Sequence, residues 1–193
     1  MPSAPLHVFA YGSLMWDPGF EFESRESSVL RGYHRAACLL SKVARGTNDQ
    51  PGLVVGLDEG GECHGVVYTV NANFRASVIE YLTNREIPRN PGIYEEAWVT
   101  IRMGRTEKRA LAFIADKKSP SYLNSMTEAE KVNFIVKGHG AKGTSIEYFQ
   151  HLIGQLHQMR VAEPALEKLT QKAEAVVGRM ILCGDQNLRA LAS

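Results

Sequence analysis

The order of strand-type and helix-type segments is the feature that most constrains the fold of this chain. Two glycine-containing sites, Gly60-Gly61 and Gly104-Arg105-Thr106, predict hairpin turns between neighbouring strand segments. Segments typical of β-strands lie at residues 6–11, 33–43, 52–58, 62–70, 96–103 and 108–115. The first two-thirds of the chain are therefore expected to form a sheet.

Helical patterns interrupt these strands once and then take over. The first helix can be capped by Asn73, and it must end near Pro88 because proline disfavours helix in the residue before it. In the last third, Thr127 and Thr144 are each followed three residues later by glutamate, which is the pattern of a capping box. A final helix is expected to begin at Pro164.

Strands first and helices later predict an α+β fold with a small curled or closed sheet and helices outside it. The run Gly138–Gly143 matches the dinucleotide-binding glycine pattern, but it joins two expected helices and does not follow a strand. A connection leading to the cap at Thr144 explains it. With 193 residues and no recognisable linker, we expect one domain over residues 1–193, with a C-terminal helix over 164–180.

Composition excludes several classes of partner. A formal net charge of +1 gives no electrostatic reason to expect nucleic acid or a membrane surface, and no stretch is apolar enough to span a bilayer. The N-terminus lacks the charged start and apolar run of a secretory signal. Because Cys38, Cys63 and Cys183 are scattered and odd in number, we expect buried thiols in a reducing cytoplasm. The histidines form no metal-ligand spacing, so no metal or cofactor is expected.

The tetrapeptide Tyr11-Gly12-Ser13-Leu14 directly follows the first expected strand. A tight turn of this composition can aim several backbone N–H groups at one point, which suits a carboxylate or another anion. An ordinary turn at the end of a strand is the alternative. No base lies near Ser13 in the sequence, so a hydrogen-bonding role for Ser13 is favoured over a nucleophilic one.

A second candidate lies where the first helix ends. Glu86 is unfavourable near the negative end of a helix dipole, which points either to a functional carboxylate or to a solvated surface residue. Its neighbour Arg85 can pair with it or bind a substrate carboxylate. Pro88, Pro91 and Gly92 then make a constrained loop of the kind that covers a pocket.

These signals occur in an order that resembles the ChaC family of γ-glutamylcyclotransferases over about residues 6–160. The opening Val8–Phe20, with its Tyr-Gly-Ser-Leu, tryptophan and Pro-Gly-Phe, is similar to the start of that family. Further similar segments follow in the family's order at 31–35, 51–55, 65–68, 81–86, 119–123 and 143–149. The chain departs from the family in two places. Ile87–Gly92 lengthens the loop after the glutamate, which bears on substrate breadth. Where the family has glycine-serine-threonine-aspartate, this chain has Leu40-Ser41-Lys42-Val43, so only Ser41 carries over.

The resemblance implies a small mixed β-barrel flanked by helices and an intramolecular reaction. The α-amine of a γ-glutamyl substrate attacks its own γ-carbonyl, which releases 5-oxoproline and an amine. It implies that Glu86 is the catalytic base. It further implies that Tyr11, Gly12, Ser13 and Leu14 bind the substrate, with Arg85, Tyr122 and Ser41 as additional binding residues.

We expect glutathione as the substrate, with 5-oxoproline and cysteinylglycine as products. Two alternatives remain open at this point. One is a cyclotransferase for other γ-glutamyl amines or dipeptides, and the other is a non-catalytic γ-glutamyl-binding regulatory protein.

Overall fold

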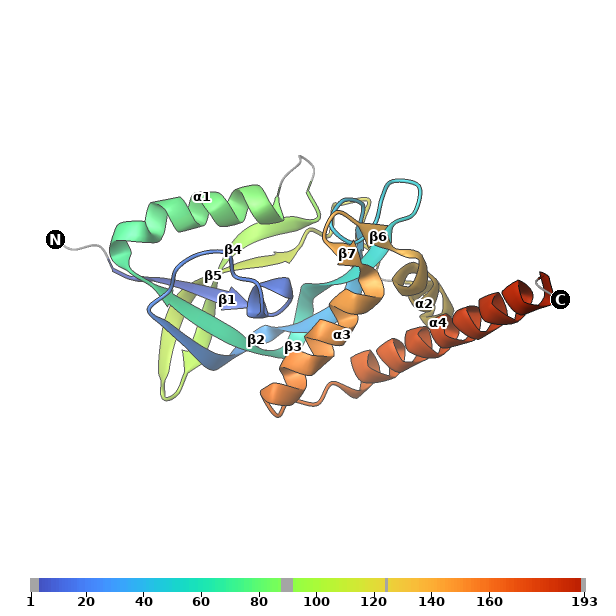
Figure 1. Cartoon of the computed structure of the whole chain (residues 1–193). Coiled ribbons are helices and arrows are strands. Elements are labelled where there is room, and N and C mark those ends of the chain that lie inside the picture. Colours follow the sequence, from blue (N-terminus) through green and yellow to red (C-terminus); the bar gives the residue numbers. More distant parts are fainter. Residues whose placement is uncertain (1–3, 88–91, 124, 192–193) are drawn as a thin grey trace. The chain divides into compact units, whose positions relative to one another are not determined.

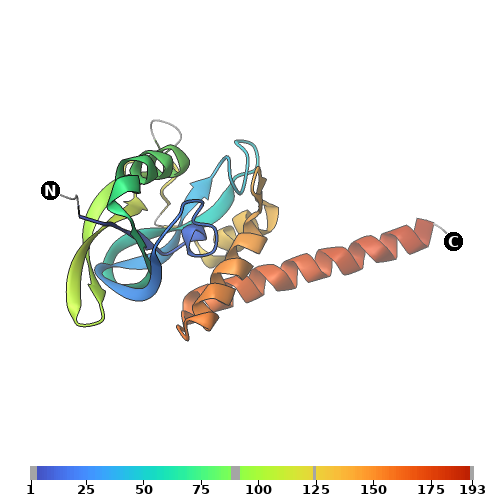
Figure 2. The same cartoon turned by 60° about the vertical axis from the view of Figure 1, so that its left-hand side comes forward.

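The computed structural model describes residues 4–87, 92–123 and 125–191, with side chains described up to residue 182. The chain forms two compact units that are interleaved in sequence. The first unit comprises residues 1–39, 55–124 and 158–161, and the second comprises residues 40–54, 125–157 and 162–193. Figures 1 and 2 show the elements from two directions.

A closed five-stranded barrel in the order β1-β3-β2-β4-β5 confirms the α+β prediction with a closed sheet. Its strands are β1 (Leu6–Ala10), β2 (Ser24–Ser41), β3 (Gly52–Val70), β4 (Tyr94–Met103) and β5 (Thr106–Ala115). Strand β1 pairs antiparallel with β3 and parallel with β5, through Val8 and Leu111. That parallel contact closes the sheet on itself, so no edge remains between β1 and β5.

The hairpin predicted at Gly60-Gly61 is wrong, because β3 runs through it as one strand from Gly52 to Val70. Both glycines have positive φ, 93° and 70°, which bends the strand locally without reversing it. The predicted hairpin at Gly104-Arg105 is confirmed: it joins β4 to β5, which pair from Tyr94–Ala115 to Met103–Thr106.

Helix α1 (Arg75–Glu86) belongs to the first unit and buries Val78 and Leu82 (Figure 1). The predicted cap at Asn73 is wrong. The side chain of Asn71 instead accepts a hydrogen bond from the Asn73 amide and begins the short 3₁₀ helix η2 (Ala72–Phe74), which leads into α1. The helix ends at Glu86, close to the predicted stop at Pro88.

The second unit contains the remaining helices, α2 (Glu128–Lys137), α3 (Ser145–Gln158) and α4 (Pro164–Leu191), and the short strands β6 (His139–Gly140) and β7 (Gly143–Thr144). Both predicted capping boxes are present. Thr127 exchanges hydrogen bonds with Glu130, and Thr144 does so with Glu147. Each box satisfies amide donors that a helix leaves open at its start. Helix α4 begins at Pro164, as predicted, and continues beyond residue 180.

Two cysteines are among the described side chains, and both are buried, Cys38 at 3% and Cys63 at 1% exposure. The side chain of Cys183 lies outside the described residues. Within the described ranges, no helix is long and apolar enough to cross a membrane. No group of three or more potential metal-ligating side chains occurs in those ranges either.

Candidate functional site

The turn after β1 lies at one end of the barrel, beside the end of β5. Strands β1 and β5 run in the same direction, so the carboxyl ends of both lie beside the start of β4. The Tyr11 hydroxyl donates a 2.6 Å hydrogen bond to the Phe113 carbonyl near the end of β5. The Asp116 amide donates to the Ile93 carbonyl just before β4. The turn after β1 therefore opens at this end.

The turn after β1 is held in place by hydrogen bonds that other side chains donate to its carbonyl groups. The buried guanidinium of Arg35 donates through Nε to the Tyr11 carbonyl at 2.7 Å and through Nη2 to the His64 carbonyl at 2.6 Å. The buried hydroxyl of Tyr68 donates to the Leu14 carbonyl at 2.9 Å. Burial raises the pKa of Tyr68, so the hydroxyl keeps its proton as a donor at neutral pH.

These carbonyl contacts orient the amides of the turn. In a trans peptide the C=O and the next N–H point in opposite directions, so the Gly12 amide points away from Arg35. Residues Ser13–Met15 form a single 3₁₀ turn, η1, whose first amides have no partner inside the turn. Within the described part of the chain, the amides of Gly12, Ser13 and Leu14 donate no hydrogen bond. The predicted turn thus offers backbone donors for an anion or a carbonyl oxygen.

Glu86 is the last residue of α1, and its side chain is largely enclosed, with 15% exposure. Its Oε1 lies 3.1 Å from Nε of Arg85. The Arg85 side chain is 9% exposed. Its Nη2 lies 3.1 Å from Oδ2 of Asp17, a residue that closely follows the turn. The two predicted candidates, the turn and the glutamate, are therefore linked through Arg85.

The charge of Arg85 is stable in this setting. Burial alone would lower its pKa, but the Tyr81 hydroxyl and the carboxylates of Glu86 and Asp17 outweigh that cost, so the pKa of Arg85 is raised above its ordinary value. A permanently charged guanidinium thus lies next to Glu86 over the whole physiological pH range.

Tyr122 lies in the loop after β5, bridged to Leu39 of β2. Its hydroxyl donates a 2.8 Å hydrogen bond to Oδ2 of Asp58. Burial and this carboxylate raise the pKa of Tyr122 to about 12. Asp58 is also paired with Lys117 at 3.1 Å. The hydrogen bonds from Tyr122 and Lys117 outweigh partial burial, so the pKa of Asp58 is lowered. The Tyr122 hydroxyl is therefore fixed by a charged partner.

Ser41 lies in the second unit, where it is buried at the end of β2. Its hydroxyl accepts a hydrogen bond from the Arg45 amide at 3.0 Å and stabilises the turn that follows the strand. Its predicted role in substrate binding stays a prediction. Most of the predicted loop 88–92 lies outside the described residues, which resume at Gly92.

Arg35 and Asp17 contact the candidate site but were not assigned a role from the sequence. A signal for Arg35 was present: it occupies the same alternating positions of β2 as the buried Ala37 and Leu39. A charged residue in a buried strand position requires partners, which makes it a candidate for a structural or functional contact. No local pattern distinguished the exposed Asp17, because its partner Arg85 is far away in the sequence.

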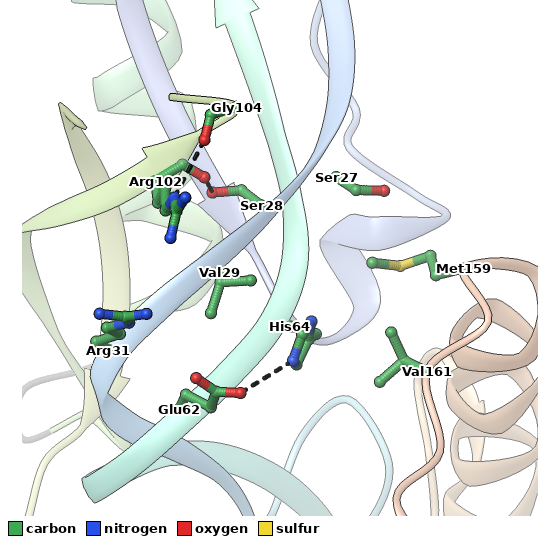
Figure 3. A pocket seen from close by; sticks show the side chains of 10 residues that line it. All are labelled: Ser27, Ser28, Val29, Arg31, Glu62, His64, Arg102, Gly104, Met159 and Val161. Atoms are coloured by element: carbon green, nitrogen blue, oxygen red, sulfur yellow. Dashed lines mark hydrogen bonds and ion pairs between the residues drawn. The ribbon is translucent and has the colours of Figure 1, made fainter. Parts of the chain in front are cut away.

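A separate pocket of about 440 Å³ opens on the first unit (Figure 3). None of the predicted site residues lines it. Arg31 and Arg102 lie on one side of it and Met159 and Val161 on the other. Between them are the side chains of His64 and Glu62, whose Nε2 and Oε1 are 3.3 Å apart. One connection between this pocket and the turn runs through Arg35, which donates to the carbonyls of both His64 and Tyr11.

Comparison with known proteins places the chain in a family. The family model described as ChaC-like protein matches residues 6–176. A glutathione-specific γ-glutamylcyclotransferase of Escherichia coli is 34% identical over 168 residues, which cover 86% of this chain and 71% of the relative. The human glutathione-specific γ-glutamylcyclotransferase 1 is 31% identical over 192 residues, 97% of this chain and 85% of that protein.

Among solved structures, the yeast γ-glutamylcyclotransferase specific to glutathione superposes with a TM-score of 0.80 and 20% identity. The match covers 90% of this chain and 97% of that one. At that identity the similarity establishes a shared fold, which confirms the predicted γ-glutamylcyclotransferase-like barrel. The family match and the identity to the curated relatives show that this chain belongs to the ChaC-like family.

Proposed function

We propose that this protein is a γ-glutamylcyclotransferase that cleaves glutathione to 5-oxoproline and cysteinylglycine. Relatives at 31–34% identity carry the name glutathione-specific γ-glutamylcyclotransferase. The observation that carries the proposal is the largely enclosed Glu86, linked through Arg85 to the segment that follows the Tyr11–Leu14 turn. A carboxylate base and a set of backbone donors are the two elements that this reaction needs.

The proposed reaction is internal to the substrate. The α-amine nitrogen of the glutamyl group forms a bond to the γ-carbonyl carbon, and the bond from that carbon to the cysteine nitrogen breaks. Glu86 takes the proton that the attacking amine loses and returns a proton to the departing amine. General acid–base help of this kind contributes about 10²- to 10⁴-fold.

The turn supplies the geometry in this proposal. Amides of Gly12, Ser13 and Leu14 hold oxygens of the glutamyl group, so the amine and the γ-carbonyl are kept in contact. Intramolecular positioning can lower a barrier by roughly 7–11 kcal/mol. Because Arg35 and Tyr68 bind the carbonyls of the turn, its donors are fixed before the substrate arrives. The Tyr122 hydroxyl, already bound to Asp58, is proposed as an additional contact.

The test is product analysis with purified protein and millimolar glutathione, in parallel with γ-glutamylalanine. Equimolar 5-oxoproline and cysteinylglycine from glutathione, with slower release of 5-oxoproline from γ-glutamylalanine, are expected. Faster turnover of γ-glutamylalanine would keep the reaction but overturn the proposed substrate. Glutathione binding without any product, measured by calorimetry, would overturn the enzyme proposal in favour of a binding protein.

We place this activity in the cytoplasm, as the sequence predicts. Two features support the location: the buried thiols of Cys38 and Cys63, which suit a reducing compartment, and a substrate that is itself a thiol. Separation of cell fractions followed by detection of the protein tests this location, and recovery from an oxidising compartment would contradict it.

A further inference from the structure

We propose that Arg85 is a positioning residue that fixes Glu86 against the segment following the Tyr11–Leu14 turn, and that it does not bind a substrate carboxylate. This inference rests on the proposed function, because it concerns the orientation of the base in that reaction. Three observations carry it: the occupied donors of Arg85, the anchoring of the segment that it contacts, and its contact with an adjacent residue of the helix.

The donors of Arg85 are almost fully used. Nε lies 3.1 Å from Oε1 of Glu86. Nη1 donates to the Tyr81 hydroxyl at 3.0 Å and to the Pro18 carbonyl at 3.3 Å. Nη2 donates to Oδ2 of Asp17 at 3.1 Å, so among the described residues a single N–H of that nitrogen has no acceptor. Binding a carboxylate by an arginine fork needs two parallel donors, so a substrate would have to displace existing contacts.

The partners of Arg85 are themselves anchored. Gly19 follows Pro18 with φ of 72°, and a Cβ on it would lie 2.0 Å from the Tyr81 hydroxyl oxygen. The ring of Phe20 lies 6.5 Å from that of Tyr81 and 5.5 Å from that of Tyr68. Only glycine allows this approach, and the ring contacts of Phe20 fix the chain directly after it. Arg85 thus connects α1 to a segment that has little freedom to move.

The contact between Arg85 and Glu86 is not a product of helix spacing. Adjacent side chains on a helix point in directions about 100° apart, whereas residues four apart, such as Tyr81 and Arg85, share a face. The guanidinium is therefore fixed by Tyr81, Asp17 and Pro18, and Glu86 turns toward it. Without Arg85, the Glu86 carboxylate would lose its 3.1 Å contact with the guanidinium, which favours the present side-chain orientation.

The charge of Arg85 has a chemical consequence. A cation at 3.1 Å favours the ionised form of Glu86, which is the form that accepts a proton. A neutral residue at position 85 removes this cation, so Glu86 is expected to take up its proton at higher pH. Both the orientation and the charge of Glu86 thus depend on Arg85.

The experiment compares Arg85→Gln, Arg85→Lys and Asp17→Asn with wild type, and uses Arg109→Gln, an exposed arginine on β5, as the matched control. For Arg85→Gln we expect kcat on glutathione to fall at least tenfold while KM changes less than threefold. The acid limb of kcat/KM should move to higher pH. Arg85→Lys should keep the wild-type acid limb of kcat/KM, because lysine retains the positive charge. It should not keep the full kcat, because lysine lacks the planar set of guanidinium donors. Asp17→Asn should lower kcat by about threefold, since Asp17 is more exposed.

Opposite results would overturn the inference. A tenfold rise in KM with unchanged kcat in Arg85→Gln would identify Arg85 as a substrate ligand, and an unchanged acid limb would refute the electrostatic link. A titration of the Glu86 carboxyl carbon by NMR reports the same link without turnover. If wild type releases no 5-oxoproline but the titration shifts in Arg85→Gln, the proposed function fails while the Arg85–Glu86 coupling stands.

Discussion

The buried guanidinium of Arg35 gives the sharpest prediction on how the fold supports the site. Two of its hydrogen bonds, at 2.7 Å to the Tyr11 carbonyl and 2.6 Å to the His64 carbonyl, join the turn to β3. Hydrogen bonds that involve a charged group are each worth about 1.5–3 kcal/mol. Arg35→Met keeps most of the apolar stem and leaves two carbonyl groups without this donor. The expected loss in the free energy of unfolding is about 3–5 kcal/mol.

The measurement is urea denaturation of wild type and Arg35→Met, with Arg31→Met as the control. Arg31 lies on the same strand but is exposed, and it forms no hydrogen bond or ion pair in the described part of the chain. Its substitution should change stability by less than about 0.5 kcal/mol. Where the protein still folds, Arg35→Met should also raise KM for glutathione, because the turn loses its support. A stability loss below about 1 kcal/mol, or one equal to that of the control, would refute this explanation of the turn.

Two further predictions concern pH and backbone conformation. Hydrogen bonds from Tyr122 and Lys117 lower the pKa of Asp58 in the folded state, so Asp58 stabilises the fold above its unfolded pKa and loses that contribution as pH falls. Asp58→Asn should therefore be less stable than wild type at pH 7. In urea denaturation the difference in stability should shrink as the pH falls below about 4, and a constant difference would contradict the assignment. Gly60→Ala should destabilise by about 1 kcal/mol through its positive φ alone, since no atom lies within 4 Å of the added carbon. Gly154 is an exposed residue of α3 with equally open space around it, so Gly154→Ala should raise the stability of the fold by about 0.5–1 kcal/mol. Equal effects of the two substitutions on thermal unfolding would contradict this explanation.

Local patterns predicted the fold where short-range chemistry decides the structure. The capping boxes at Thr127 and Thr144 depend on contacts three residues apart, and both are present. The order of strands and helices likewise reflects side-chain periodicity and gave the correct fold class. The strand pattern left open whether the sheet is curled or closed. The parallel contact between β1 and β5 shows that it is closed.

The errors arise where tertiary pairing decides the structure. Gly60-Gly61 has the composition of a hairpin turn, but both halves of β3 find partners in the barrel, so the glycines bend a continuous strand. Asn71 and Asn73 are equally good caps by residue type, and a 3₁₀ turn before α1 decides between them. In the candidate site, the roles of Arg35 and Asp17 depend on partners far away in the sequence, which no local pattern specifies.

The most direct test of the central claim is the turnover of glutathione by Glu86→Gln, measured as 5-oxoproline released at saturating substrate. Glu80→Gln, an exposed glutamate on the same helix, is the matched control. We predict that Glu86→Gln loses at least about 10²-fold in kcat while Glu80→Gln keeps the wild-type value. Wild-type turnover by a well-folded Glu86→Gln would contradict the assignment of Glu86 as the base.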